Sequence, residues 1–142
     1  MGKVKDILRT KGNKVYSVEP SIMVYEAIAL MCEKNIGGLL ILQNDKLEGI
    51  FTERDYARKL ILKGKSSKNT PISELMTRNP ITVLPETSIE DCMDLMTGKF
   101  IRHLPVVEEG RLVGLISIGD VVKHIIEEQK DIIEHLENYI SR

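Results

Sequence analysis

An internal repeat is the feature of this sequence that most constrains its fold. When the chain is displaced by 65 positions, the difference between Asp55 and Asp120, residues 18–55 align with residues 83–120 without a gap. A repeat of this kind predicts two copies of one supersecondary unit. The identical pairs include Val18/Val83, Pro20/Pro85, Leu30/Leu95, Met31/Met96, Lys34/Lys99, Ile36/Ile101, Leu39/Leu104, Leu47/Leu112, Gly49/Gly114 and Asp55/Asp120.

The segments that precede the two copies match with a different displacement. Residues 4–8 (VKDIL) resemble residues 72–76 (ISELM), which come 68 positions later (72 − 4). The loop that joins the first segment to its repeat is therefore three residues longer (68 − 65). We call residues 4–8 the first lead-in and residues 72–76 the second lead-in.

Each copy has the pattern β-α-β-β-α. A short strand, at residues 15–18 or 81–83, leads through a proline turn to a helix, for which Ser21 and Thr87 are candidate N-caps. The next apolar run is typical of a strand buried on both faces. A turn and a third strand follow, and a second helix begins near Thr52 or Ser117. The strand glycines, Gly49 and Gly114, predict bulges or a close backbone approach.

The two copies are expected to form a single mixed α/β fold. A unit of about 50 residues has little core of its own. We therefore expect two pseudo-symmetric β-α-β-β-α motifs packed sheet to sheet, with a long C-terminal helix. The polar stretch at residues 63–71 (KGKSSKNTP) predicts the linker, which divides the chain into residues 1–65 and 66–142.

Composition argues against several classes of protein. The formal net charge is −1, Trp is absent and aromatic residues are 4% of the chain, which disfavours nucleic-acid binding. The longest apolar stretch, residues 39–42, is too short to span a membrane, and no secretory signal is visible. We expect a cytoplasmic protein. Cys32 and Cys92 are expected as buried reduced thiols, with a disulfide or a redox sensor as the alternative.

The junction between the third strand and the second helix carries the same pair of polar residues in both copies. Thr52 and Asp55 stand there in the first copy, and Ser117 and Asp120 in the second. A hydroxyl and a carboxylate at this spacing can cap a helix. A surface helix accepts many other residues at the Asp position, so a binding role is the second interpretation.

The repeat resembles the CBS (cystathionine β-synthase) motif from Val4 to about Ile126. The segments that carry the resemblance are both lead-ins, NIGGLLIL (35–42), FIRHLPVV (100–107), LEGIFTERD (47–55) and LVGLISIGD (112–120). The chain is also similar to small bacterial proteins made only of a CBS pair, the Bateman-type module. The resemblance implies a regulatory protein that binds AMP, ADP, ATP, NAD or S-adenosylmethionine in clefts between the two motifs.

The resemblance also implies roles for particular residues. Asp120 and Asp55 would accept both hydroxyls of a ribose, since an ionised carboxylate has two oxygens. Arg102 and His103 would bind phosphate, with a solvated strand edge as the alternative. The first copy has Gly37 and Gly38 at these positions and cannot supply phosphate ligands from them.

Two inequivalent clefts follow from this implication. One cleft combines Ser117, Asp120, Arg102 and His103 with an adenine pocket around Val15, Tyr16, Ile36 and Gly37. The other cleft combines Thr52 and Asp55 with Met76, Ile81 and Ile101, and its phosphate ligands would be Arg54 and Arg58. A solvated helix face is the alternative for both arginines.

The last helix is expected to pair with a second copy of the chain. An apolar stripe recurs every three or four residues, widened by Ile126, Ile133 and Ile140. His124 and His135 are expected at the surface of this helix. The stripe consists of Val122, Ile125, Gln129, Ile132, Leu136 and Tyr139.

The expected function is therefore a sensor of adenine nucleotides that acts as a homodimer on an unidentified regulated protein. No Walker loop, metal cluster or nucleophile with a base is visible, so neither a catalytic residue nor a catalytic cofactor is expected. The alternatives are a structural or interaction scaffold whose ligand clefts are vestigial, and a sensor of S-adenosylmethionine.

Overall fold

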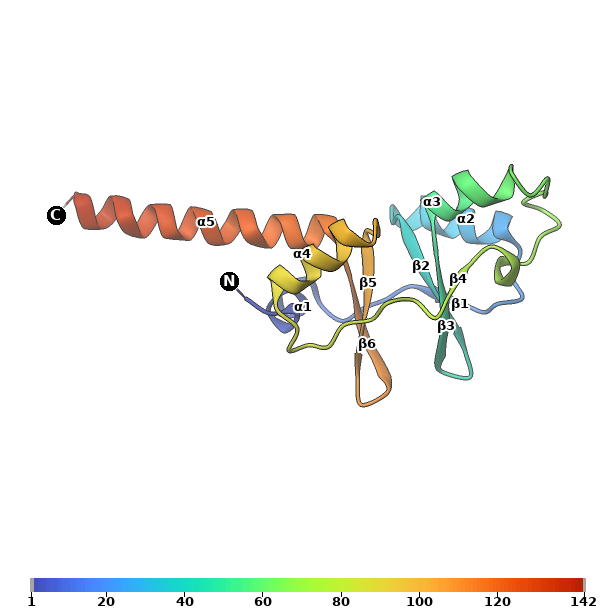
Figure 1. Cartoon of the computed structure of the whole chain (residues 1–142), viewed down its shortest axis with the longest axis horizontal. Helices are drawn as coiled ribbons and strands as arrows, with labels where there is room; N and C mark the ends of the chain where they lie inside the picture. The colour runs from blue at the N-terminus through green and yellow to red at the C-terminus, as the bar shows by residue number, and fades with distance from the viewer. Residues whose placement is uncertain (1, 142) are drawn as a thin grey trace. The chain divides into compact units, whose positions relative to one another are not determined.

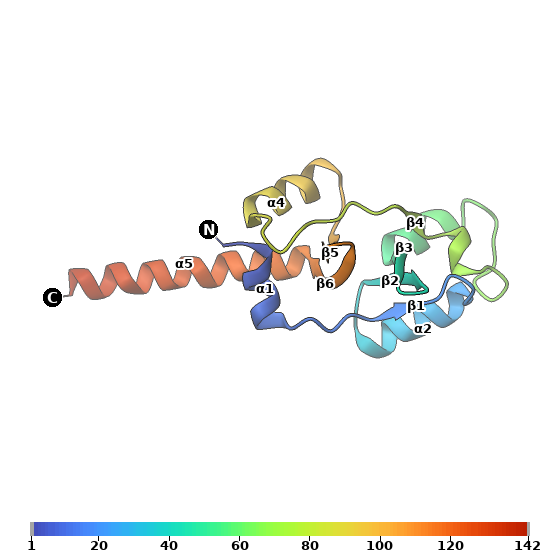
Figure 2. The same cartoon turned by 90° about the horizontal axis from the view of Figure 1, so that it is seen from below.

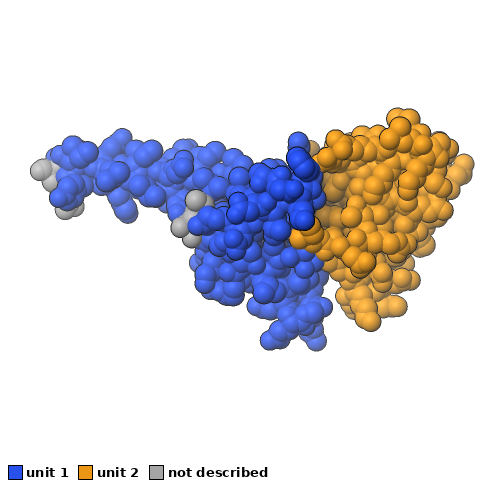
Figure 3. Space-filling model, viewed as in Figure 1, with its two compact units in different colours: residues 1–13, 82–142 blue, residues 14–81 orange. Residues whose placement is uncertain are grey.

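The order of helices and strands follows the sequence repeat in the computed structural model, which describes residues 2–141 (Figure 1). The chain divides into two units with separate cores, coloured blue and orange in Figure 3. Unit 1 contains the chain up to residue 13 and again from residue 82, and unit 2 contains residues 14–81.

Unit 2 contains the first copy of the repeat. Its four-stranded sheet has the order β1-β2-β3-β4, in which β1 is parallel to β2 and the other pairs are antiparallel. The elements are β1 (Ser17–Val18), α2 (Val24–Lys34), β2 (Gly38–Gln43), β3 (Lys46–Thr52), α3 (Glu53–Asp55), the π-helix η1 (Tyr56–Leu60), the 3-10 helix η2 (Ile72–Glu74) and β4 (Thr77–Arg78).

Unit 1 contains the second copy. Its strands β5 (His103–Glu108) and β6 (Arg111–Ser117) form an antiparallel hairpin, and Val83 pairs with Val106 in parallel, as β1 pairs with β2 in unit 2. The helices are α1 (Val4–Lys11), α4 (Ile89–Gly98) and α5 (Ile118–Ile140). The C-terminal half of α5 extends beyond the other elements of the unit (Figures 1 and 2). The mixed α/β architecture and the long last helix are as the sequence predicts.

The two strand glycines occupy equivalent and crowded positions. The register of the β2–β3 pair shifts between Ile41 and Leu42, beside Gly49, and the β5–β6 pair shifts at the equivalent place, beside Gly114. A Cβ on Gly49 would lie 2.7 Å from the Thr77 carbonyl oxygen. A Cβ on Gly114 would lie 2.8 Å from Leu8 Cδ2. The predicted bulges and the predicted close approach are both confirmed.

Each lead-in packs with the other copy of the repeat. Val4 is fully buried in the core of unit 1, and its N–H donates to the Thr87 carbonyl at 2.9 Å. Ile72 is fully buried in the core of unit 2, and its N–H donates to the Ile22 carbonyl at 2.7 Å. We call this exchange the crossing of the lead-ins. Because of it, the chain passes from unit 1 to unit 2 between residues 13 and 14 and returns between residues 81 and 82, whereas the sequence repeat suggested a division at 65/66.

The polar stretch at residues 63–71 is the predicted linker between the two motifs. It lies inside unit 2, where the Thr70 carbonyl accepts from the Val24 N–H at 2.8 Å and the Ser67 carbonyl accepts from the Tyr25 N–H at 2.9 Å. Thr70 is buried. Backbone carbonyls of this stretch thus satisfy the first amides of α2.

Several local predictions need correction. The helices α2 and α4 begin after Met23 and Ser88, and not after Ser21 and Thr87. The Ser88 hydroxyl caps α4 by accepting from the Asp91 N–H at 3.1 Å. Thr87 instead closes the preceding turn, since its hydroxyl accepts from the Leu84 N–H at 2.9 Å. The strand predicted at residues 81–83 is reduced to a single bridge at Val83.

The prediction of buried reduced thiols is confirmed for Cys92 and wrong for Cys32, which is exposed. Cys92 is buried, and that burial raises the pKa of its thiol to about 11. Cys32 is exposed on α2, and both thiols are free. Among residues 2–141, no helix combines the length and the apolar character that crossing a bilayer requires.

Candidate functional site

The junction between β6 and α5 holds Ser117 and Asp120 in a reciprocal pair of hydrogen bonds. The Ser117 hydroxyl accepts from the Asp120 N–H at 3.2 Å, and Asp120 Oδ2 accepts from the Ser117 N–H at 2.8 Å. This arrangement is a capping box, which satisfies two amides at the start of a helix. The predicted capping role of Ser117 is confirmed.

Asp120 has a second partner that the sequence did not indicate. Lys11, the last residue of α1, places its Nζ 2.7 Å from Asp120 Oδ2 and 2.8 Å from the Leu115 carbonyl oxygen. The Asp120 side chain is 23% exposed. Burial raises the pKa of Asp120, but the hydrogen bonds from Lys11 and Ser117 outweigh burial, so that pKa lies below its ordinary value of 3.8. The carboxylate is therefore ionised at neutral pH.

Arg102 and His103 lie beside the same junction. His103 is paired with Ser117 across the β5–β6 ladder. The Arg102 carbonyl accepts from the Ile118 N–H at 2.9 Å. The Arg102 side chain is exposed and that of His103 is half-buried. The backbone of unit 1 thus brings the four predicted residues Ser117, Asp120, Arg102 and His103 together.

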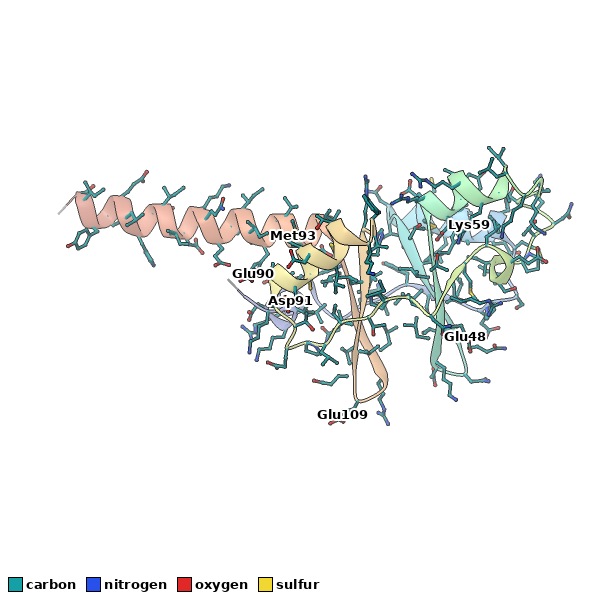
Figure 4. All side chains as sticks on the ribbon, viewed as in Figure 1. Glu48, Lys59, Glu90, Asp91, Met93 and Glu109 are labelled. Atoms are coloured by element: carbon teal, nitrogen blue, oxygen red, sulfur yellow. The ribbon has the colours of Figure 1, made fainter. Side chains whose placement is uncertain are left out.

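The junction between β3 and α3 in unit 2 repeats the capping box. The Thr52 hydroxyl accepts from the Asp55 N–H at 3.2 Å, and Asp55 Oδ2 accepts from the Thr52 N–H at 2.9 Å. Asp55 Oδ1 accepts from the Thr77 hydroxyl at 3.2 Å and lies 3.0 Å from Lys59 Nζ. Figure 4 shows Lys59 on the helical segment that follows β3. Both oxygens of this carboxylate thus have partners within the unit, and Asp55 is only 9% exposed.

The glycines of the first copy occupy the place of Arg102 and His103. Gly38 is paired with Thr52 in the ladder, and the Gly37 carbonyl accepts from the Glu53 N–H at 3.1 Å. Arg54 and Arg58 are exposed on the helical segment that follows. Because the two glycines have no side chains, a side chain that binds phosphate at this junction would have to come from a residue such as Arg54 or Arg58.

The other predicted site residues are divided between the units. Val15, Tyr16 and Ile36 are half-buried in unit 2. The Tyr16 ring has the ammonium groups of Lys14 and Lys34 at 5.3 Å and 5.6 Å from its centre. Met76 is buried in unit 2, Ile81 is 37% exposed at its end, and Ile101 belongs to unit 1. Both predicted clefts draw on residues of both units and stay predictions.

Sequence reasoning missed three residues that contact the two carboxylates. Lys59 stands four positions after Asp55, and the helical i, i+4 rule could have identified it. Thr77 follows the second lead-in, and Lys11 lies 109 positions from Asp120. No local pattern indicates either contact, since both depend on the crossing of the lead-ins.

Unit 1 has a further surface groove of about 790 Å³ between residues 82–84 and α4. Thr82, Asp91 and Lys99 are on its walls, and Figure 4 labels Asp91 on α4. None of the predicted site residues lines this groove. Among residues 2–141, no group of three or more His, Cys, Asp or Glu side chains is arranged to hold a metal ion.

Comparison with known proteins adds independent information. The sequence profile of the CBS domain matches residues 4–62 and 72–127. The chain is 38% identical over 150 residues to the CBS domain-containing protein CBSX3, mitochondrial, of Arabidopsis thaliana, which covers 97% of this chain and 71% of that protein.

Two solved structures are similar. A protein with CBS domains from Burkholderia ambifaria MC40-6 has a TM-score of 0.86 and 48% identity, and the alignment covers 89% of this chain and 96% of that chain. CBSX2 in complex with AMP has a TM-score of 0.75 and 27% identity, with 91% of this chain and 99% of that chain covered.

Proposed function

This chain belongs to the CBS domain family, and from that premise we propose that it binds an adenine nucleotide at the β6–α5 junction and acts as a regulatory sensor. Proteins built of CBS pairs are commonly regulatory. The ligands that we propose are AMP, ADP, ATP or NAD, and the AMP complex of CBSX2 supports this class. The proposal includes no catalytic activity, and it places the protein in the cytoplasm.

The observation that carries the proposal is the carboxylate of Asp120. It is ionised, partly exposed and held at the start of a 23-residue helix, so its orientation is fixed before a ligand arrives. A carboxylate with two oxygens can accept both hydroxyls of a ribose, and such charge-assisted hydrogen bonds are strong. In this proposal Asp120 is the ribose ligand.

The neighbouring residues take the roles that the family resemblance implies. Arg102 and His103 bind the phosphate, since they lie beside Ser117 and Ile118 in unit 1. The adenine contacts aliphatic side chains and backbone groups of the first copy, around Val15, Tyr16, Ile36 and Gly37. An apolar pocket with a few polar anchors is typical of such ligand sites.

We propose one ligand per chain. At the junction in unit 2, a ribose would have to displace Lys59 or Thr77 from Asp55, whose side chain is largely buried. Removing a buried carboxylate from its partners costs free energy that ribose binding must first offset. The set of Thr52, Asp55, Arg54, Arg58, Met76, Ile81 and Ile101 is therefore the secondary site of the proposal.

The experiment is a calorimetric titration of AMP, ADP, ATP, NAD and S-adenosylmethionine into the protein. We expect at least one nucleotide to bind with a Kd below about 1 mM and a stoichiometry near one. Asp120→Ala should weaken that binding by at least about tenfold, and Asp55→Ala should change it little while lowering the thermal stability. Equal binding by the wild type and by Asp120→Ala would refute the site.

A scaffold without a ligand is the second candidate, and the capping boxes favour it. The hydrogen bonds between Asp120 and Ser117, and between Asp55 and Thr52, account for the two Asp residues without any nucleotide. If none of the five compounds binds below about 1 mM, the carboxylates are structural and the scaffold is the function.

We further propose that the chain works as a homodimer through α5. From residue 129 onward every described residue of this helix is exposed, including Ile133 at 54% and Leu136 at 56%. An isolated helix of about a dozen residues is marginally stable in water, so we expect the apolar stripe on the exposed half of α5 to pack against another surface. A second copy of the chain supplies a matching stripe by symmetry.

A further inference from the structure

We propose that Lys11 is an exchangeable partner of Asp120, which closes this carboxylate in the unliganded protein and passes to a nucleotide phosphate when a ligand binds. The inference rests on the proposed function and deepens it, because it names a residue that makes the site prefer nucleotides to nucleosides. It also connects the site with the end of α1.

The contacts of Asp120 Oδ2 show which partner can leave. This oxygen accepts from the Ser117 N–H at 2.8 Å and from Lys11 Nζ at 2.7 Å. A carboxylate oxygen offers two lone pairs, and both are thus engaged. The Ser117 amide belongs to the backbone of the capping box and cannot move away without opening the helix start. Lys11 is therefore the partner that can move.

Binding of a ribose requires that movement. A cis-diol that engages both oxygens of Asp120 needs a lone pair on Oδ2, and the Lys11 ammonium occupies one. The Lys11 side chain is 36% exposed, and its flexible four-carbon stem can turn while α1 stays in place. The ammonium can also keep its hydrogen bond of 2.8 Å to the Leu115 carbonyl, because it has three donors.

When the Lys11 ammonium leaves Asp120 it loses a charge-assisted hydrogen bond, which a second anion can replace more fully than water. A nucleotide bound through its ribose brings a phosphate to the same site, and a nucleoside does not. Lys11 therefore opposes the binding of a nucleoside, because its hydrogen bond to Asp120 is lost. When a nucleotide binds, a new contact between Lys11 and the phosphate compensates part of that loss.

The equivalent lysine in unit 2 provides a structural contrast. Lys59 Nζ lies within 3.3 Å of three acceptors, namely Asp55 Oδ1, the Leu75 carbonyl and the Thr77 hydroxyl. All three of its donors are thus used. Lys59 is the better-anchored lysine, and the exchange belongs to Lys11.

The exchange has a consequence for α1. Lys11 is the last residue of this helix, and Gly12 follows with a φ of 93°, just before the chain passes from unit 1 to unit 2. Lys11 holds this end of α1 to α5 through Asp120 and to β6 through the Leu115 carbonyl, and the exchange gives up the contact with α5. Figure 2 shows α1 crossing the first part of α5. Transfer of the ammonium to a ligand loosens this end and so reports occupancy to the N-terminal segment.

The test compares adenosine with AMP by calorimetry in the wild type, Lys11→Met, Lys11→Arg and Lys5→Met. Lys5 is the matched control, because it lies on the same helix but pairs with Glu86. We expect the wild type to bind AMP more tightly than adenosine. In Lys11→Met adenosine should bind more tightly than in the wild type, and the ratio of the two Kd values should fall about tenfold.

The other two variants, Lys11→Arg and Lys5→Met, test whether the effect depends on the charge and on the position of the lysine. Lys11→Arg keeps the charge and should retain most of the AMP preference, while Lys5→Met should retain all of it. An unchanged ratio in Lys11→Met, with binding intact, overturns the role of Lys11 and leaves the proposed function standing. If neither adenosine nor AMP binds to the wild type, the role of Lys11 is overturned, and the proposed function is overturned as well only if ADP, ATP and NAD also fail to bind.

A second measurement needs no variant. Amide hydrogen exchange at residues 9–12 should become faster in the wild type when AMP saturates the site, because the end of α1 loses its contact with Asp120. Circular dichroism will show whether Lys11→Met folds. If that variant fails to fold, this exchange experiment decides alone, and unchanged or slower exchange contradicts the proposal.

Discussion

At the scale of single residues, Asp55 and Asp120 share a register and a capping box but differ in their surroundings. Asp55 is 9% exposed and both of its oxygens have partners within unit 2. The Asp120 side chain is 23% exposed, and its ammonium partner comes from a flexible side chain on α1. The same sequence motif thus gives one carboxylate that is locked into the fold and one that is open to exchange.

The ion pair of Asp120 predicts a dependence of stability on pH. Because the pKa of Asp120 in the folded state lies below the ordinary value of 3.8, the ionised form stabilises the fold above that pH. The stabilisation is lost as the pH falls through the folded-state pKa. We expect carboxyl NMR titration to give a pKa below 3.8 for Asp120 in the wild type and a higher pKa in Lys11→Met.

Asp6 is the internal control for this titration. The backbone N–H of Lys3 is the main cause that lowers the pKa of Asp6, and Lys11 is not among the causes. The pKa of Asp6 should therefore be the same in both proteins. An identical Asp120 pKa in the wild type and Lys11→Met would show that the ion pair does not form in solution.

The two thiols predict selective labelling. Burial raises the pKa of Cys92 to about 11, so this thiol is protonated and inaccessible at neutral pH. Cys32 is exposed, so an alkylating reagent should modify it alone in the native protein. Peptide mass spectrometry checks the site, and Cys32→Ser should abolish native labelling. Rapid labelling of Cys92 without denaturant would contradict the described packing.

At the scale of elements, the crossing of the two lead-ins explains why two small copies form cores. Leu8 packs against Gly114 in unit 1, and Met76 packs against Gly49 in unit 2. Each core is completed by a segment that the sequence places beside the other copy. Neither copy of the repeat is thus a separate folding unit by itself.

The crossing of the lead-ins predicts that two equivalent substitutions weaken different units. Each removes buried side-chain volume and should destabilise the protein by about 2–5 kcal/mol. Leu8→Ala should weaken amide protection in β5 and β6, and Met76→Ala should weaken it in β2 and β3. Hydrogen exchange with mass spectrometry measures both. Loss of protection in β2 and β3 on Leu8→Ala, with β5 and β6 intact, would contradict the crossing.

At the scale of elements, the bulges and the helix caps could be predicted from the sequence. The displacement of 65 positions located the bulges beside Gly49 and Gly114, because a strand glycine in both copies indicates close backbone contact. The hydroxyl and carboxylate spacing predicted the capping role of Thr52 and Ser117. These features depend on residues that are near in sequence.

The remaining features depend on contacts between distant segments. The pairing of Lys11 with Asp120 joins residues 109 positions apart, and the exposure of Cys32 depends on which face of α2 meets the core. The choice of Ser88 over Thr87 as the N-cap depends on the preceding turn, in which Thr87 is already engaged. Periodicity and spacing contain no information on such choices.

At the scale of the whole molecule, the apolar stripe of α5 predicts self-association. Ile133 and Leu136 are more than half exposed in the single chain. Replacing both with Asp places charges in the proposed dimer contact, which should dissociate the dimer. Analytical ultracentrifugation should give a dimer for the wild type and a monomer for the double variant.

Glu134 provides the control for this experiment, because it is exposed on the same helix outside the stripe. Glu134→Gln should sediment as the wild type does. Circular dichroism should show that the body of the double variant remains folded. A wild type that is monomeric at about 100 μM, well above a typical dimer Kd, would contradict the pairing.

The most direct test of the account is a comparison of AMP with 2′,3′-dideoxy-AMP, which lacks both ribose hydroxyls, in the wild type and in Asp120→Ala. If Asp120 holds the diol, calorimetry should show that loss of the hydroxyls weakens binding to the wild type by at least about tenfold. The same loss should have little further effect on Asp120→Ala, where the partner is already missing. Equal affinity of the wild type for the two compounds would contradict the assignment of Asp120 as the ribose ligand.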